Sequence, residues 1–183
     1  YTVFVDGISK AFAATGVRVG WSMGPESLIQ KIKAVNSHVG SWAPMAEQKA
    51  TARFLENNEA VVSYLSHIRK EVFARLQGLY EGFMSLKAEG FSVDAIQPQA
   101  AIYLTVQIDL KGKANSEGLA FDDQAAVTNY ILDKAKLAMV PFGFFGADRE
   151  SNWYRISVGC CKMEEIPEVI NNLRSALLPF KSH

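Results

Sequence analysis

The chain has few cysteines and histidines, the residues on which disulfide-linked and metal-binding proteins depend. Its 183 residues include three histidines and two cysteines, and the cysteines are neighbours, Cys160 and Cys161. Adjacent cysteines do not readily bridge each other, and scattered histidines do not have the spacing of a zinc site. We therefore expect no disulfide framework and no metal. The two thiols should fill a strand in the core, and the compartment should be a reducing one, the cytoplasm.

Net charge is also lacking. Nineteen lysine and arginine residues balance nineteen aspartate and glutamate residues. A neutral chain lacks the long-range attraction that draws proteins to nucleic acid or to anionic lipid. No apolar run approaches the length needed to cross a bilayer. We therefore expect neither nucleic acid nor a membrane as a partner.

What the chain does have is the composition of a globular protein, with 49% hydrophobic and 21% charged residues. Apolar periodicity and turn residues predict helices over 26–35, 46–57, 59–86, 122–135 and 164–178. They predict strands over 1–5, 17–23, 91–93, 101–110, 136–140 and 154–160. In the longest helix a continuous apolar stripe is expected from Val62 through Phe73 to Phe83. Strands and helices in this order predict an α/β fold, an open sheet with helices packed on it.

One short run near the N-terminus stands out, SKAFAATGVRVGW, from Ser9 to Trp21. Lys10 follows Ser9 directly, and Arg18 comes eight residues later between Val17 and Val19. A lysine that forms a Schiff base must be held rigidly beside an anion site, and an arginine can bind a phosphate through two parallel hydrogen bonds. The run resembles the cofactor-lysine signature of class I/II aminotransferases, pyridoxal-phosphate (PLP) enzymes of fold type I that include aspartate aminotransferase.

The resemblance implies that the chain is the C-terminal portion of such a subunit, since the lysine of that family lies past the middle of the chain. Residues 1–30 would then end the large cofactor domain, 31–85 would be an interdomain helical segment, and 86–183 would form a small α+β domain. The opening at Tyr1 agrees with this, because it reads as the middle of a buried strand and has no initiator methionine. We expect this fragment alone to be inactive.

The resemblance also assigns the cofactor site. Lys10 would be the catalytic residue, which anchors PLP as a Schiff base and then carries a proton between the substrate Cα and the cofactor. Arg18 and Ser9 would hold the phosphate. Gly7 stands where many family members have a phosphate-binding serine, so it could contribute only its backbone N–H. The alternatives are a solvated loop lysine for Lys10 and a salt-bridged surface arginine for Arg18.

A second arginine resembles the substrate-binding arginine of the family. Arg155 lies in a predicted apolar strand, where an unpaired guanidinium is costly. It would bind the α-carboxylate of the substrate, or else pair with a carboxylate of the protein itself. Nearby, Phe142, Phe144 and Phe145 either line a substrate pocket or pack in the ordinary way.

The function that the resemblance implies is transfer of an amino group between an amino acid and a 2-oxo acid. A PLP-dependent C–S lyase of the same fold is a second hypothesis. A non-catalytic relic of the fold that serves as a dimerisation module is a third. The family implies a homodimer, in which Ser41, Trp42 and Gln48 would lie in a loop near the neighbouring subunit's site, or simply in a surface loop.

Overall fold

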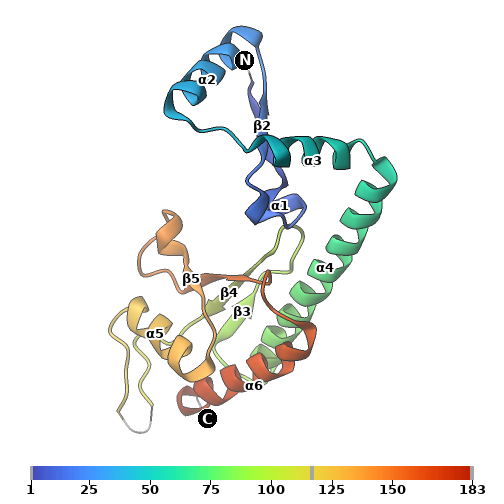
Figure 1. Ribbon diagram of the computed structural model, residues 1–183. Coiled ribbons are helices and arrows are strands. Elements are labelled where there is room, and N and C mark those ends of the chain that lie inside the picture. Colours follow the sequence, from blue (N-terminus) through green and yellow to red (C-terminus); the bar gives the residue numbers. More distant parts are fainter. Residues whose placement is uncertain (1, 116–117, 182–183) are drawn as a thin grey trace. The chain divides into compact units, whose positions relative to one another are not determined.

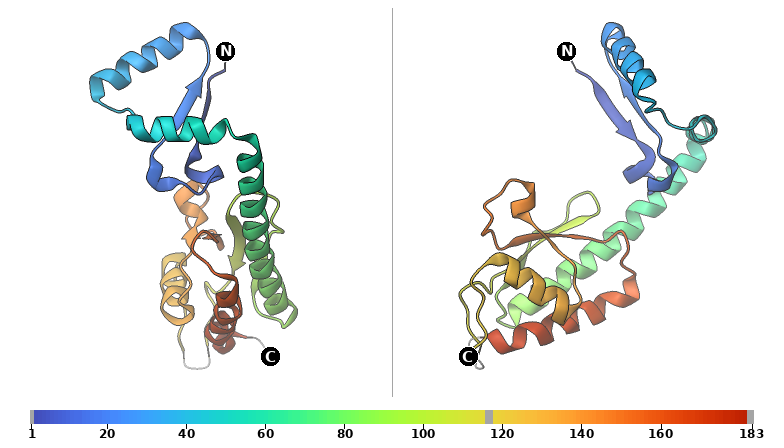
Figure 2. Two further views of the ribbon diagram at one scale, coloured as in Figure 1. Left: turned by 45° about the vertical axis from the view of Figure 1, so that its right-hand side comes forward. Right: turned by 60° about the vertical axis from the view of Figure 1, so that its left-hand side comes forward.

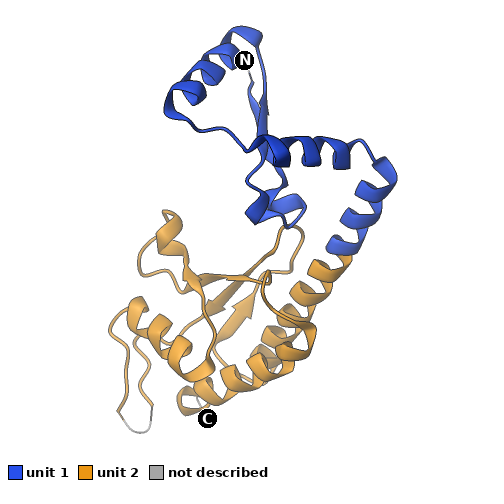
Figure 3. Cartoon of the chain, in the orientation of Figure 1, with its two compact units in different colours: residues 1–69 blue, residues 70–183 orange. Residues whose placement is uncertain are grey.

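The structure is a computed structural model that describes residues 2–115 and 118–181. It has two compact units, residues 1–69 and residues 70–183 (Figure 3). The longest helix, α4 (Asn58–Ala88), continues from the first unit into the second (Figure 1). The division of the chain into 1–30, 31–85 and 86–183 stays a prediction.

The first unit begins with two short antiparallel strands, β1 (Phe4–Gly7) and β2 (Gly20–Met23). Between them lie a single turn of helix, α1 (Ile8–Ala11), and a 3₁₀ turn, η1 (Thr15–Val17), where the sequence predicted only a loop. The predicted strand over 17–23 starts three residues late. The reason is Arg18, whose φ of 59° is left-handed and breaks the extended run.

Two helices follow in this unit. Helix α2 (Glu26–Val39) runs four residues beyond its predicted end, because it stops only at Gly40, whose φ of 67° gives the usual left-handed C-terminal cap. Helix α3 (Met45–Leu55) begins directly after Pro44. No residue of α2 is buried among the described residues.

Several apolar side chains that the sequence predicted to be buried are exposed in this unit. Phe4 is 50% and Val5 is 74% exposed, so the expected buried strand is exposed where the structure describes it, while Tyr1 lies outside the described residues. Among the described residues β1 pairs with β2 alone, and that pairing leaves both faces of β1 open. The apolar stripe of α4 is likewise interrupted, since Val62 and Phe73 are exposed and burial begins only at Leu76.

The second unit is built on a four-stranded sheet that is antiparallel throughout. Its strands are β3 (Val93–Ala95), β4 (Tyr103–Ile108), β5 (Val140–Pro141) and β6 (Trp153–Ser157), in the order β3-β4-β6-β5. Alternate residues of β4 and β6 are buried, which gives the sheet one core face and one outward face.

Three helices gather on this sheet: the second half of α4, α5 (Gln124–Ala135) and α6 (Ile166–Leu177), with α5 and α6 side by side (Figure 2). Short 3₁₀ turns stand at 142–145, 163–165 and 178–180. Gly78 and Gly82 of α4 face Ile166 and Ile170 of α6, and a side chain at either glycine would press on these isoleucines. The core combines residues of all three helices with the sheet, among them Phe83, Leu104, Ile131, Tyr154 and Leu173.

Two predictions about strands in this unit are wrong. The strand expected over 136–140 is reduced to Val140–Pro141, because α5 ends at Lys136 in a left-handed conformation with φ of 56°. The strand expected over 154–160 ends at Ser157, so the cysteines lie beyond it. Cys160 is exposed, whereas Cys161 is half-buried and packs against the core from outside a strand; partial burial raises the pKa of the Cys161 thiol.

No helix in the ranges 2–115 and 118–181 is long and apolar enough to cross a membrane.

The start of α5 offers a direct test of local stability. The Asp123 carboxylate accepts a hydrogen bond of 2.8 Å from the Ala126 backbone N–H, as an N-cap residue does. We expect Asp123→Ala to lower the free energy of unfolding by about 0.5–2 kcal/mol, measured by urea titration. Asp122→Ala is the matched control, and an equal loss in that variant would refute the cap.

Candidate functional site

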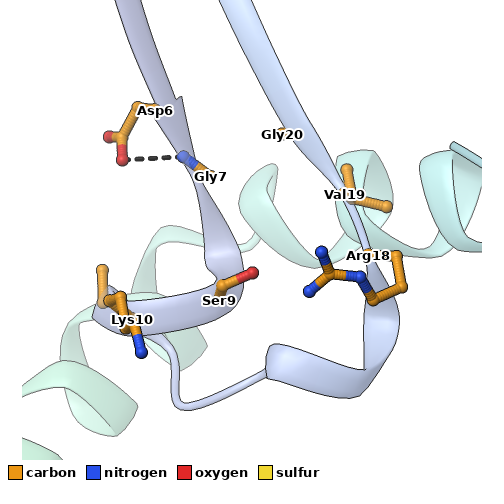
Figure 4. A pocket seen from close by; sticks show the side chains of 8 residues that line it. Asp6, Gly7, Ser9, Lys10, Arg18, Val19 and Gly20 are labelled. Carbon is orange, nitrogen blue, oxygen red and sulfur yellow. Dashed lines mark hydrogen bonds between the residues drawn. The ribbon is translucent and has the colours of Figure 1, made fainter. Parts of the chain in front are cut away.

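A pocket opens in the first unit at the junction of β1, α1 and β2 (Figure 4). Its volume is about 520 Å³. The residues that line it are Asp6, Gly7, Ser9, Lys10, Ala11, Arg18, Val19 and Gly20. All four residues that the sequence predicted for the cofactor site are therefore brought to one pocket.

Two glycines bring the backbones of β1 and β2 together beside this pocket. Gly7 lies opposite Gly20 in the antiparallel register. A Cβ atom at Gly7 would meet the Val19 carbonyl oxygen at 3.0 Å, and one at Gly20 would meet the Asp6 carbonyl oxygen at the same distance. Since such contacts are too short for ordinary packing, glycine at both positions allows the close approach of the two strands that brings Ser9 and Arg18 to the same pocket.

Lys10 lies in the single turn of α1 and is exposed. Within the described part of the chain its ammonium group has no hydrogen-bond or salt-bridge partner. Figure 4 shows its side chain on the side of the α1 turn away from Arg18. An amine that is held by no other group is available to react.

Aromatic residues of α3 and α4 hold the turn that carries Lys10, through contacts with Phe12. The Tyr64 hydroxyl donates a hydrogen bond of 2.6 Å to the Phe12 carbonyl oxygen. The Phe12 ring stacks on Tyr64 with centroids 6.1 Å apart and meets Phe54 edge-on at 5.7 Å. Tyr64 and Phe54 were missed by sequence reasoning, because neither belongs to a local motif and Tyr64 lies 52 positions from its partner.

Arg18 is the second basic residue of the pocket, beside Lys10. Its Nη1 donates a hydrogen bond of 2.8 Å to the Thr15 carbonyl oxygen, which holds the side chain against the η1 turn. Figure 4 shows the guanidinium pointing toward the Ser9 hydroxyl. Arg18 forms no ion pair with any residue that the structure describes, so the salt-bridged alternative finds no support. Its remaining donors can bind an anion with the fork geometry of arginine.

Gly7 lines the pocket, but its N–H is already engaged. It donates a hydrogen bond of 2.7 Å to Oδ1 of Asp6 (Figure 4). A role for this N–H in phosphate binding stays a prediction, and it requires the bond to Asp6 to open first. Arg18 and Ser9 are the residues whose polar groups are free to hold a phosphate.

Arg155 belongs to the second unit, in β6. It points to the outward face of the sheet, opposite Thr105 of β4, and is half-buried. The expected penalty of a fully buried guanidinium therefore does not arise. Arg155 has no carboxylate partner among residues 2–115 and 118–181, and its guanidinium lies instead over the rings of Tyr103 and Phe145. Of the phenylalanines of the 142–145 turn, Phe144 and Phe145 are exposed, and Phe142 packs edge-on against Phe145.

Other predicted sites have less support in the geometry. Trp42 is exposed, and the Gln48 side chain in α3 donates to the Ala43 carbonyl oxygen in the loop before that helix, so their place in a dimer interface stays a prediction. Where the chain is described, no three histidine, cysteine, aspartate or glutamate residues are grouped as a metal site would need.

Comparison with known proteins gives consistent results. Residues 1–173 match the protein family described as aminotransferase class I and II. A bifunctional aspartate aminotransferase and glutamate/aspartate-prephenate aminotransferase of Petunia hybrida is 28% identical over 181 residues, which is 98% of this chain and 36% of that protein. An aspartate aminotransferase of Rhizobium meliloti is 28% identical over 176 residues, which is 96% of this chain and 40% of that protein.

Solved structures show the same fold. The crystal structure of the Rhizobium meliloti aspartate aminotransferase has a TM-score of 0.78 at 24% identity, and the match covers 98% of this chain and 42% of that one. A double mutant of the Thermus thermophilus aspartate aminotransferase has a TM-score of 0.79 at 26% identity, and the match covers 96% of this chain and 41% of that one. The predicted α/β fold type I is thus confirmed. The chain spans about two fifths of the length of these proteins.

Proposed function

Because the chain belongs to the class I and II aminotransferases, we propose that it supplies the cofactor lysine of a PLP-dependent aminotransferase. The observation that carries the proposal is a single pocket lined by the Ser9 hydroxyl, the Arg18 guanidinium and Lys10, whose amine has no partner among the described residues. PLP carries an aldehyde, which reacts with a lysine amine, and a phosphate, which needs an anion-binding site; the pocket offers both kinds of group.

The residues present fit PLP in chemistry. Arg18 would bind the phosphate through paired hydrogen bonds, and the Ser9 hydroxyl would donate one more. The Lys10 amine would hold the aldehyde carbon. When bound, PLP withdraws electrons from the substrate Cα so that its proton can leave.

The chain's own residues would then do three things. Once the amino group of the substrate has displaced it from the aldehyde carbon, Lys10 Nζ would take the proton from the substrate Cα as a general base and return a proton to the cofactor as a general acid. Arg18 fixes the phosphate, which keeps the cofactor within reach of Lys10. Arg155, on the outward face of its sheet, binds the carboxylate that every amino acid and 2-oxo acid carries.

We further propose that the full-length protein is a homodimer of the cytoplasm and that this chain by itself is inactive. Phe4, Val5 and Trp42 are exposed apolar side chains, which supports the proposal that other parts of the protein or a second subunit cover them. The named activities of the relatives make aspartate with 2-oxoglutarate the first pair to test. Formation of oxaloacetate by the full-length protein with PLP would support an aminotransferase. Pyruvate and ammonia released from a cysteine conjugate, with no amino exchange, would instead support the C–S lyase.

The role of Arg18 can be tested without straining the backbone. Asparagine tolerates a left-handed φ better than most residues, so Arg18→Asn removes the guanidinium while the φ of 59° is kept. We expect the affinity for PLP to fall about 10- to 100-fold, the effect of losing hydrogen bonds to a charged group. Fluorescence titration with PLP measures this. Arg53→Asn, an exposed arginine of α3, is the control, and unchanged affinity in Arg18→Asn would remove Arg18 from the site.

A further inference from the structure

The Arg155 guanidinium lies over two aromatic rings. Its central carbon lies 4.3 Å from the centroid of the Tyr103 ring and 4.3 Å from the centroid of the Phe145 ring. Tyr103 comes from β4, the strand paired with β6, and Phe145 from the 3₁₀ turn η2 (Phe142–Phe145) that follows β5. Three separate segments of the second unit thus meet at one cation.

The guanidinium carbon lies over the face of each ring. Aromatic faces carry negative charge density and attract a cation that lies over them. All five N–H donors of arginine lie in the plane of the group, at its edge. Since Arg155 has no hydrogen-bond or ion-pair partner in the described ranges, these donors remain available to a ligand.

We propose that Phe145, with Tyr103, is a positioning residue that fixes the plane of Arg155 so that its edge receives the substrate carboxylate. A free arginine side chain must lose rotamer freedom when it binds. The stacked one has already lost that freedom in the folded protein. Binding of a carboxylate therefore costs less, as in other preorganised sites. The inference rests on the proposed function, because it deepens the role of Arg155 in it.

The surroundings of Phe145 favour this role over ordinary packing. Phe145 is 50% exposed, so it is not held there by burial in the core. Its neighbour Phe144 on the same turn is 80% exposed, and its ring has no cation over it among the residues that the structure describes. Phe142 packs edge-on against Phe145 at 6.1 Å, which supports the ring in its place over Arg155. The stack is thus specific to one of the two exposed phenylalanines.

The test uses the full-length protein loaded with PLP and measures the affinity for two unreactive carboxylates, maleate and 3-phenylpropionate, by calorimetry. Phe145→Leu keeps an apolar side chain but removes the aromatic face, whereas Phe145→Trp keeps that face. We expect Phe145→Leu to weaken carboxylate binding about three- to tenfold. In turnover, KM for the amino acid should rise by a similar factor with kcat little changed. PLP affinity should be unaffected, which reports that the protein is folded.

Two further variants make the outcome decisive. Phe144→Leu is the matched control and should bind carboxylates as the unaltered protein does, as should Phe145→Trp. Equal affinity of Phe145→Leu and the unaltered protein would overturn the inference, and so would an equal loss in Phe144→Leu. Arg155→Gln tests the proposed function separately. If it binds both carboxylates normally, Arg155 is not their ligand. If it loses binding while Phe145→Leu does not, only the positioning role fails.

Discussion

Replacement of Lys10 by alanine is expected to reduce transamination by about 10⁴-fold or more, because both the anchoring of the cofactor and the proton transfer at Cα depend on this amine. The loss should not come from unfolding. Lys10 is exposed and has no side-chain partner among the residues that the structure describes, so its removal breaks no contact that holds the first unit together.

The measurement is turnover of the full-length protein with PLP, combined with borohydride reduction and peptide mapping. In the unaltered protein we expect one phosphopyridoxyl group, on Lys10; in Lys10→Ala that adduct should be absent. Lys31→Ala, at an exposed lysine of α2 in the same unit, controls for nonspecific effects. An adduct on another lysine, or full activity in Lys10→Ala, would show that the pocket is not the cofactor site.

The second large effect concerns stability and should arise in the core of the second unit. Phe83 of α4 is completely buried, in the cluster formed by the three helices and the sheet. Phe83→Ala should lower the free energy of unfolding by about 3–5 kcal/mol, since it removes a large apolar side chain and leaves a cavity. Urea titration of the full-length protein, followed by circular dichroism, measures this loss.

Phe73 provides the comparison, because it is the same residue in the same helix but 58% exposed. Phe73→Ala should change the free energy of unfolding by no more than about 0.5 kcal/mol. If both variants lose the same stability, the burial described for α4 does not reflect the folded protein.

Much of the secondary structure could be predicted, and the failures have local causes. Helices were predicted well where an apolar period was sustained, as in α4 and α6. The ends were less accurate, because α2 continues to the glycine that can cap it, Gly40. The strands failed where single residues adopt a left-handed conformation, at Arg18 and Lys136. Side-chain types do not reveal such a conformation when the residue is neither glycine nor asparagine.

For the candidate site residues, too, the sequence predicted some features and missed others. Lys10, Ser9, Gly7 and Arg18 could be predicted together because they lie within twelve positions of one another and belong to one motif. For Arg155 the sequence predicted its importance but not its surroundings. The sequence did not indicate the two aromatic rings over which its guanidinium lies, and its binding of a substrate carboxylate stays a prediction.

By itself, then, the sequence determined the family, the fold class and the lysine pocket, since each depends on residues that are close along the chain or on a regular apolar period. Only the tertiary structure decided which aromatic residues lie against the Lys10 turn in the first unit and against Arg155 in the second. Tyr64 reaches the Phe12 carbonyl across 52 positions, and Phe145 reaches Arg155 from a separate turn. Contacts of this kind arise when the core brings distant segments together, because packing depends on complementary shape and not on separation along the chain.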